Sequence, residues 1–269
     1  DDPGNALMRN DGDGTFTDVA GDLGMTVELI GWGVIFFDFD NDGDLDLYVA
    51  NGCISGTAND GQLGCTWNSG FSTELPHANI LFSNNGDGTF MDVSDFSGLA
   101  NSYLTTGAAI GDINNDGFYD IYEVNELDSS PSSNHCRLYK NNFGEINPGI
   151  RWIKVKLEGV ASNRNAIGSR IYISQQDGAL QQIREINSGE SYSSQSSYTA
   201  SFGTGSLALI DTLKISWPSG LVQYHYNIDP NQTHYIVEGQ NSDELSCLFP
   251  VENYDCEGNC IVEVDCSGE

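Results

Sequence analysis

Residues 33–49 read GVIFFDFDNDGDLDLYV, in which two β-rich runs enclose a short segment of Asp, Asn and Gly. The same arrangement returns 74 positions later at 107–123, as GAAIGDINNDGFYDIYE. The recurring residues include Asp38, Gly43 and Asp46, which return as Asp112, Gly117 and Asp120. A constant offset across the whole pattern indicates an internal structural repeat.

A second motif recurs at the same offset. Residues 5–19 match residues 79–93, and each copy contains an Asn-x-Gly-Asp-Gly turn, at 10–14 and 84–88. Asn and Gly tolerate the positive φ of tight hairpin turns, so each turn is expected to join two strands. Four short strands per repeat predict the blades of a β-propeller, and a truncated third copy begins at Leu138.

The Asp-rich segments carry the chemistry. Each is a nine-residue loop with oxygen-bearing side chains at positions 1, 3, 5 and 9, Gly at position 6, and a backbone carbonyl on offer at position 7. Ca²⁺ takes six to eight oxygen ligands in flexible geometry, whereas Mg²⁺ prefers a rigid octahedron with several waters. The expected metal ligands are Asp38, Asp40, Asp42, Asp44 and Asp46 in the first loop, and Asp112, Asn114, Asp116, Phe118 and Asp120 in the second.

Two other interpretations of these loops are weaker. An Asp-rich turn without an ion would leave several carboxylates repelling one another. An EF-hand needs a bidentate Glu at position 12, where the first loop has Val49; the second has Glu123, but within a β-like run. The loops therefore predict at least two strand-loop-strand calcium sites.

The formal net charge of −29 is unevenly distributed. Residues 1–136 carry a net charge of −22, residues 137–238 of +1, and residues 239–269 of −8. The acidic balance argues against a nucleic-acid partner, which requires a basic face, and no apolar run is long enough for membrane insertion. With 39% hydrophobic residues the chain has enough apolar content for a core. These shifts predict three parts: blades over 1–146, a second domain over 147–238, and an acidic tail or linker over 239–269.

The middle segment alternates in seven short runs punctuated by Gly, Asn, Ser and Pro. This spacing predicts an antiparallel β-sandwich, so the expected fold class is all-β throughout. The expected strands are 152–157, 169–174, 182–186, 198–202, 211–217, 222–228 and 234–238.

Both halves resemble known families. Residues 33–49 and 85–90 are similar to the FG-GAP/VCBS repeats of integrin-α-type β-propellers, a resemblance that implies calcium in each blade loop and an extracellular (secreted or cell-surface) setting. Runs at 152–157, 162–168, 182–189 and 217–223 resemble the ASPIC/UnbV domain. The combination is similar to the cartilage acidic protein family, which implies a matrix or surface protein with no defined reaction. Arg164, Arg170 and Arg184 are either scattered arginines or an anion site.

The blades are too few to close a propeller, which needs about four to eight. Residues 1–24 read as the end of one blade, 25–98 as a complete blade and 99–146 as a nearly complete one. Open blades would expose sheet edges, so we expect further blades upstream of Asp1 or on a neighbouring molecule, with self-assembly through open edges as one outcome.

Seven cysteines lie at positions 53, 65, 136, 247, 256, 260 and 266. Given the extracellular setting that the resemblance implies, disulfide bonds are favoured over a zinc site, with Cys53–Cys65 as one expected pair and Cys136 free or paired elsewhere. Asn231 heads the glycosylation sequon of the chain.

Three classes of function remain open. The favoured one is a non-catalytic, calcium-binding adhesion or matrix module with a protein or glycan partner, since no hydrolase, zinc-protease, P-loop or dinucleotide motif is present. The second is a calcium-dependent lectin, for which loop 51–78 with Trp67, Phe71 and His77 is the candidate surface. The third is part of a secreted enzyme acting on polysaccharides.

Overall fold

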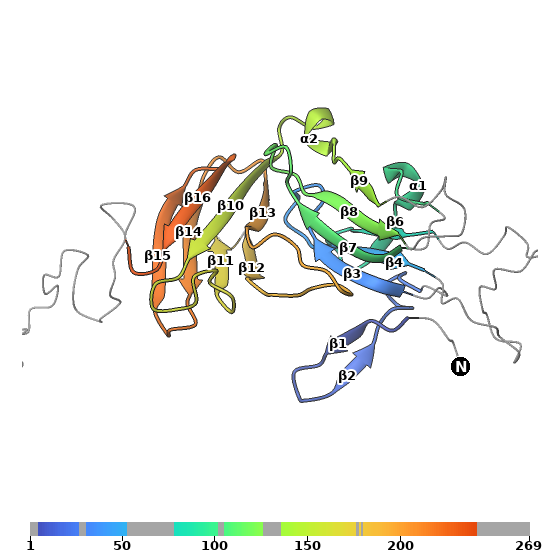
Figure 1. The fold of residues 1–269 in the computed structure, drawn as a ribbon, viewed down its shortest axis with the longest axis horizontal. Coiled ribbons are helices and arrows are strands. Elements are labelled where there is room, and N and C mark those ends of the chain that lie inside the picture. The colour runs from blue at the N-terminus through green and yellow to red at the C-terminus, as the bar shows by residue number, and fades with distance from the viewer. Residues whose placement is uncertain are drawn as a thin grey trace, which may run out of the picture.

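The strands of the computed structural model form five sheets in two groups (Figure 1). The structure describes residues 5–26, 31–52, 78–101, 105–125, 136–175, 178 and 180–240. Strands β1 to β9 precede residue 140 and make the first group, and strands β10 to β16 make the second. The described chain is therefore all-β apart from two single-turn helices, as the sequence predicts.

The first repeat folds as a four-stranded antiparallel sheet in the order β3-β4-β5-β6. Its strands are β3 (Gly31–Phe37), β4 (Asp46–Asn51), β5 (Ile80–Asn84) and β6 (Phe90–Asp92). The Asp-rich loop joins β3 to β4, and the Asn-Gly hairpin joins β5 to β6, with Gly86 at φ +73°. Strands β1 (Met8–Asn10) and β2 (Phe16–Asp18) form the preceding hairpin.

The second repeat is a three-stranded sheet in the order β7-β8-β9. Its strands are β7 (Thr105–Gly111), β8 (Asp120–Asn125) and β9 (Arg137–Tyr139). After β9 the chain reads Asn-Asn-Phe-Gly-Glu at 141–145 in place of Asn-x-Gly-Asp-Gly, and it turns into helix α2 (Phe143–Ile146) rather than a hairpin. The glycines that adopt positive φ in the other copies are missing here, so the fourth strand does not follow.

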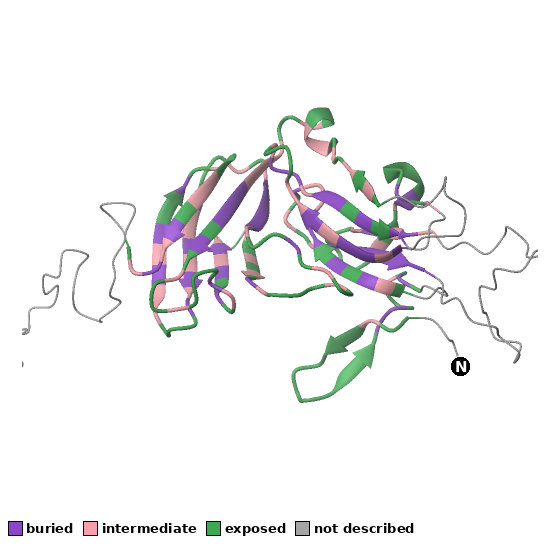
Figure 2. Cartoon of the chain, in the orientation of Figure 1, coloured by how far each residue is buried: buried purple, intermediate pink, exposed green. Residues whose placement is uncertain are grey.

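Apolar side chains lie between successive sheets. Along β3 burial alternates, with Ile35 and Phe37 buried and Val34 and Phe36 exposed, the period of a strand with one covered face (Figure 2). The buried face belongs to a cluster that extends to Ala108, Ile110 and Ile121 of the next sheet. Helix α1 (Ser94–Ser97) follows β6 on the way to that sheet. The blades thus stack through shared cores.

The second group is a β-sandwich with a sheet β13-β10-β16 and a sheet β12-β11-β14-β15. Its strands are β10 (Arg151–Glu158), β11 (Arg170–Ser174), β12 (Gln181–Glu185), β13 (Ala200–Gly205), β14 (Ile210–Ser216), β15 (Val222–Ile228) and β16 (Gln232–Val237). All seven expected runs are strands. The core includes Ile153, Val155, Ile171, Phe202 and Leu213, and burying each such side chain contributes about 2 kcal/mol.

One pair of strands departs from the antiparallel expectation. Strand β16 pairs with β10 in parallel, from Ile153 opposite Gln232 to Glu158 opposite Val237. The chain leaves β15 in one sheet and enters the other sheet at its edge, so that β16 runs in the direction of β10. Every other pairing in the sandwich is antiparallel.

The sandwich contacts the second repeat through the connection between β12 and β13. The Ser197 amide donates to the Ile110 carbonyl (3.2 Å), and the Ser194 hydroxyl donates to the Ala108 carbonyl (2.7 Å). Tyr119 donates its hydroxyl to Thr199 (2.5 Å). Within the described residues, neither short helix has the length and hydropathy of a membrane span.

Candidate metal centre

The two Asp-rich loops have the same backbone. Position 4 is an Asn with positive φ in both, Asn41 at +58° and Asn115 at +59°, and position 6 is Gly43 at +106° and Gly117 at +99°. In both, the position 1 carboxylate accepts the position 6 amide, at 3.1 Å for Asp38 and 2.8 Å for Asp112. The repeat seen in the sequence is therefore a repeat in conformation.

The carboxylate at position 9 also makes the same pair of hydrogen bonds in both loops. Asp46 accepts the amides of Phe39 and Asn84 on separate oxygens, each at 2.9 Å. Asp120 accepts Ile113 and Asn141 in the same way, again at 2.9 Å. Each carboxylate thus joins its loop to a residue at or just after the end of a later strand, Asn84 or Asn141, and so contributes to the structure in addition to any metal ligation.

The first loop gathers three carboxylates. Asp38, Asp40 and Asp42 each offer a carboxylate oxygen, and these three oxygens lie within 4.8 Å of one another. Asp38 is 5% exposed, and its Oδ1 is buried without a hydrogen-bond partner. A buried carboxylate oxygen without a donor is costly unless a cation meets it, so this loop fits a hard divalent cation.

Electrostatics in the loop agree with that fit. Burial raises the pKa of Asp38 to about 7, against the opposing effect of Arg184, and the charges of Asp40 and Asp42 raise it further. Burial likewise raises the pKa of Asp40 to about 6, again with help from Asp42. Burial raises the pKa of Asp46 to about 8, although the amides of Asn84 and Phe39 act against the rise. Without a cation, the loop holds negative charge at a high cost.

The second loop is arranged differently around the same backbone. The ammonium of Lys154, on β10 of the sandwich, forms an ion pair with Asp112 Oδ2. Asp112 Oδ1 accepts the Asp116 amide (3.2 Å), and the Asn114 amide group donates to Asp116 Oδ2 (2.7 Å). At position 7, Phe118 is buried against Phe143, with ring centroids 6.3 Å apart. Asp112 is thus engaged by an ammonium group, and the expected second set of ligands, Asp112, Asn114, Asp116, Phe118 and Asp120, stays a prediction.

Lys154 is the residue that sequence reasoning missed. Ile153, Val155 and Leu157 of β10 face the sandwich core, which puts Lys154 and Lys156 on the opposite face. Lys154 is buried by the blade, whereas Lys156 is exposed, and nothing in the local pattern separates the two. Burial lowers the pKa of Lys154 to about 8, while the Asp112 carboxylate favours its charged form.

The first loop also contacts the sandwich, through backbone amides. Gly203 of β13 donates to Asp38 Oδ2, and Gly205 donates to the Asn41 carbonyl, both at 3.1 Å. A side chain at Gly203 would collide with Asp38 and Asn41, so glycine permits this approach. Both loops thus lie at the junction between the blades and the sandwich (Figure 1).

Glu123, at position 12 of the second loop, is a buried carboxylate that accepts several hydrogen bonds inside the core. It lies in β8, as expected, and accepts hydrogen bonds from the Tyr48 hydroxyl, Asn79 (2.8 Å) and Asn101 (3.2 Å). Burial raises its pKa, and these donors oppose the rise. The network joins the two repeats and leaves Glu123 engaged inside the core.

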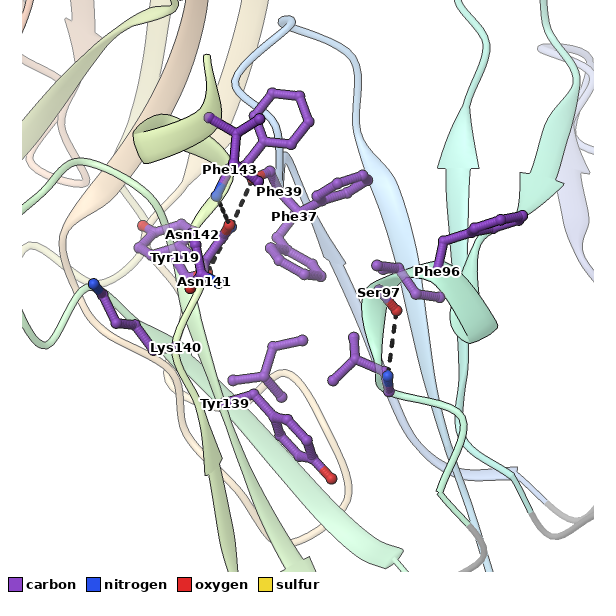
Figure 3. Close-up of a pocket in the computed structure, with 14 residues that line it drawn as sticks. Phe37, Phe39, Phe96, Ser97, Tyr119, Tyr139, Lys140, Asn141, Asn142 and Phe143 are labelled. Carbon is purple, nitrogen blue, oxygen red and sulfur yellow. Dashed lines mark hydrogen bonds between the residues drawn. The ribbon is translucent and has the colours of Figure 1, made fainter. Parts of the chain in front are cut away.

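A groove of about 240 Å³ lies between the two repeats (Figure 3). Phe37, Phe39 and Phe143 gather at one end and Tyr139 lies at the other (Figure 3). Among its described lining residues there is no carboxylate, imidazole or thiol, and its Lys140 pairs with Glu145 at 2.5 Å. The groove is lined mainly by apolar and aromatic side chains.

The three arginines considered as an anion site have separate partners. Arg164 pairs with Glu158 (3.4 Å) and Arg170 with Glu185 (2.9 Å). Arg184 donates to the Ser201 carbonyl (3.1 Å) and lies over the ring of Phe202. The arrangement is one of individually paired arginines.

Several sequence predictions fall outside the described residues. These are the lectin-type residues Trp67, Phe71 and His77 and all the expected disulfide cysteines. Cys136 lies within the described part, where it is a free, exposed thiol. Disulfide bonds in this chain remain predictions.

Comparison with protein families agrees with this architecture. The protein belongs to the all-β class and consists of repeated sheets with Asp-rich loops, followed by a β-sandwich. The FG-GAP-like repeat model matches residues 1–49 and 59–123, and the ASPIC and UnbV model matches residues 159–243. A search of curated proteins found no match. The chain therefore carries FG-GAP-like repeats followed by an ASPIC and UnbV domain, and such repeats are often found in extracellular or cell-surface proteins.

Proposed function

We propose that the chain is a non-catalytic, secreted or cell-surface module of adhesion or matrix type, which binds calcium in its first loop. The ion would be held by carboxylate oxygens of Asp38, Asp40 and Asp42, with Asp44 and Asp46 completing the loop. The observation that carries the proposal is the buried Oδ1 of Asp38, which has no donor and belongs to a group of three carboxylates. Ca²⁺ supplies the positive charge and the flexible coordination that this group needs.

Calcium at this position would stabilise more than its own loop. Asp38 Oδ2 accepts the Gly43 amide of its own loop and the Gly203 amide of the sandwich. An ion on Asp38 Oδ1 would therefore bind the same carboxylate that joins the blade to the sandwich. Neutralising the loop removes repulsion between carboxylates that the fold holds together. We therefore expect calcium to stabilise the junction between blades and sandwich.

The non-catalytic assignment rests on the chemistry of the described groove and of the sequence. The described groove residues include no carboxylate, imidazole or thiol, and the proposed calcium would account for the carboxylates that do cluster. The proposed partner is an extracellular protein or a glycan, because an acidic surface of this kind does not suit nucleic acid.

A calcium titration of the 269-residue chain tests the proposal. Isothermal calorimetry should show binding, and the melting temperature should rise with added Ca²⁺; at 100 times the dissociation constant the gain is about 2.7 kcal/mol. Asp40→Asn should abolish calcium binding by the first loop and the rise in melting temperature that it causes. Asp22→Asn makes the same change of charge at an exposed turn and should leave it intact. An unchanged melting temperature in wild type, with no heat of binding, would contradict the proposal.

A further inference from the structure

We propose that Lys154 is the resident cation of the second loop, so that this loop joins the blade to the sandwich without calcium. The proposal departs from the sequence, which predicts a metal in both loops. It concerns the second loop alone and does not depend on whether the first loop binds calcium.

The shared backbone is the starting point. The two loops have matching φ values at positions 4 and 6 and matching hydrogen bonds at positions 1 and 9. Any difference in cation preference must therefore arise from the side chains on that backbone and from what approaches it.

What approaches the second loop is an ammonium group enclosed with its partner. The side chains of Lys154 and Asp112 are 6% and 4% exposed. The Lys154 ammonium lies 4.9 Å from the Trp152 ring and 5.8 Å from the Tyr119 ring, so aromatic faces complete its surroundings. Trp152 in turn packs on Gly117, where a side chain would collide with the indole. The ion pair is therefore built into the packing of the junction.

The side chains at positions 1 and 3 of the second loop also differ from those of the first loop. Both oxygens of Asp112 have donors, whereas Oδ1 of Asp38 in the first loop has none. Position 3 is Asn114, whose amide group donates to Asp116 instead of adding a charge. A calcium ion at Asp112 would also stand beside a buried ammonium, and like charges at such distances repel strongly in a low dielectric.

The consequence is a difference in response to chelators. A calcium ion can be withdrawn from the first loop, whereas Lys154 is covalently part of β10. The second contact between blade and sandwich should therefore persist when calcium is removed.

Calcium stoichiometry of the full chain tests this inference. Wild type, Lys154→Met and Lys156→Met are titrated by calorimetry and by equilibrium dialysis with ⁴⁵Ca²⁺. Methionine keeps most of the length of the lysine side chain and removes its charge. Lys156 lies two residues along the same strand, is exposed, and serves as the matched control.

We expect Lys154→Met to bind one more calcium ion than wild type, and Asp116→Asn added to that variant to remove the extra ion. Lys156→Met should bind the same number as wild type. The inference is overturned if Lys154→Met gains no ion. If Lys154→Met does not fold, wild type and Asp116→Asn decide the question: equal stoichiometry supports the inference, and the loss of one ion in Asp116→Asn overturns it. Because the measure is an increment, it is separate from the first-loop test with Asp40→Asn.

Discussion

The first and second Asp-rich loops have one backbone, but their carboxylates have different surroundings. In the first, Asp38 keeps a buried oxygen without a donor, next to Asp40 and Asp42. In the second, Asp112 faces the ammonium of Lys154, and both of its oxygens are engaged. The comparison teaches that one loop backbone can place its first carboxylate in two different surroundings, because the sandwich supplies a backbone amide to Asp38 and an ammonium group to Asp112.

Position 7 should give the largest contrast between the loops. Phe118→Ala removes a buried ring that packs on Phe143 and should lower the free energy of unfolding by about 4 kcal/mol. Asp44→Ala, at the exposed equivalent position, should change it by less than about 0.5 kcal/mol. Urea denaturation in chelator measures both. Equal effects would mean that position 7 does not distinguish the loops.

Position 6 should give the next contrast. A methyl group at Gly117 would meet the Trp152 indole, whereas at Gly43 it would meet the end of the Gln182 side chain, which can move. Both glycines have positive φ, so both substitutions cost backbone strain, but Gly117→Ala should cost about 3 kcal/mol and Gly43→Ala about half of that. Thermal melts in chelator compare the two, and a larger loss at Gly43 would contradict the packing argument.

Position 9 should show no contrast. Asp46 and Asp120 each accept two backbone amides, so in chelator Asp46→Asn and Asp120→Asn should each cost about 2 kcal/mol. The measurement is again the free energy of unfolding. A large difference between the two variants would show that one of these carboxylates has a further structural contact that the shared hydrogen bonds do not explain.

Glu238 shows how hydrogen bonds stabilise a charged carboxylate, and its contribution to stability should depend on pH. It accepts hydrogen bonds from the Ser219 hydroxyl, from the Ser162 amide and hydroxyl, and from the Val160 amide. Despite the opposing effect of burial, these donors lower its pKa from 4.5 to about 2.

A lowered pKa in the folded state stabilises the fold above the unfolded pKa, and this stability is lost as pH falls from 4.5 towards 2. The stability difference between wild type and Glu238→Gln should therefore be constant from pH 7 to 5 and shrink below it. Denaturation midpoints across that range measure the difference. A difference that stays constant down to pH 2 would contradict the assignment.

Much of the fold was predictable because it depends on local sequence patterns. The 74-residue repeat, the Asn-Gly hairpins and the seven strands of the sandwich follow from periodicity and turn chemistry. The parallel pairing of β10 with β16 was not predictable, because strand direction depends on which sheet the chain enters after β15. Helix α2 follows from the missing glycines after β9, a signal that is present in the sequence.

The sequence alone determined where the two loops lie, their shared conformation and the carboxylates they carry, because Asp, Asn and Gly at fixed spacing restrict the backbone locally. Only the tertiary structure decided how those carboxylates are balanced. Lys154 is 42 residues from Asp112, and its burial depends on how the sandwich packs against the blade. A charge that arrives from another domain leaves no trace in the local pattern, because the desolvation and pairing that define its role exist only in the folded chain.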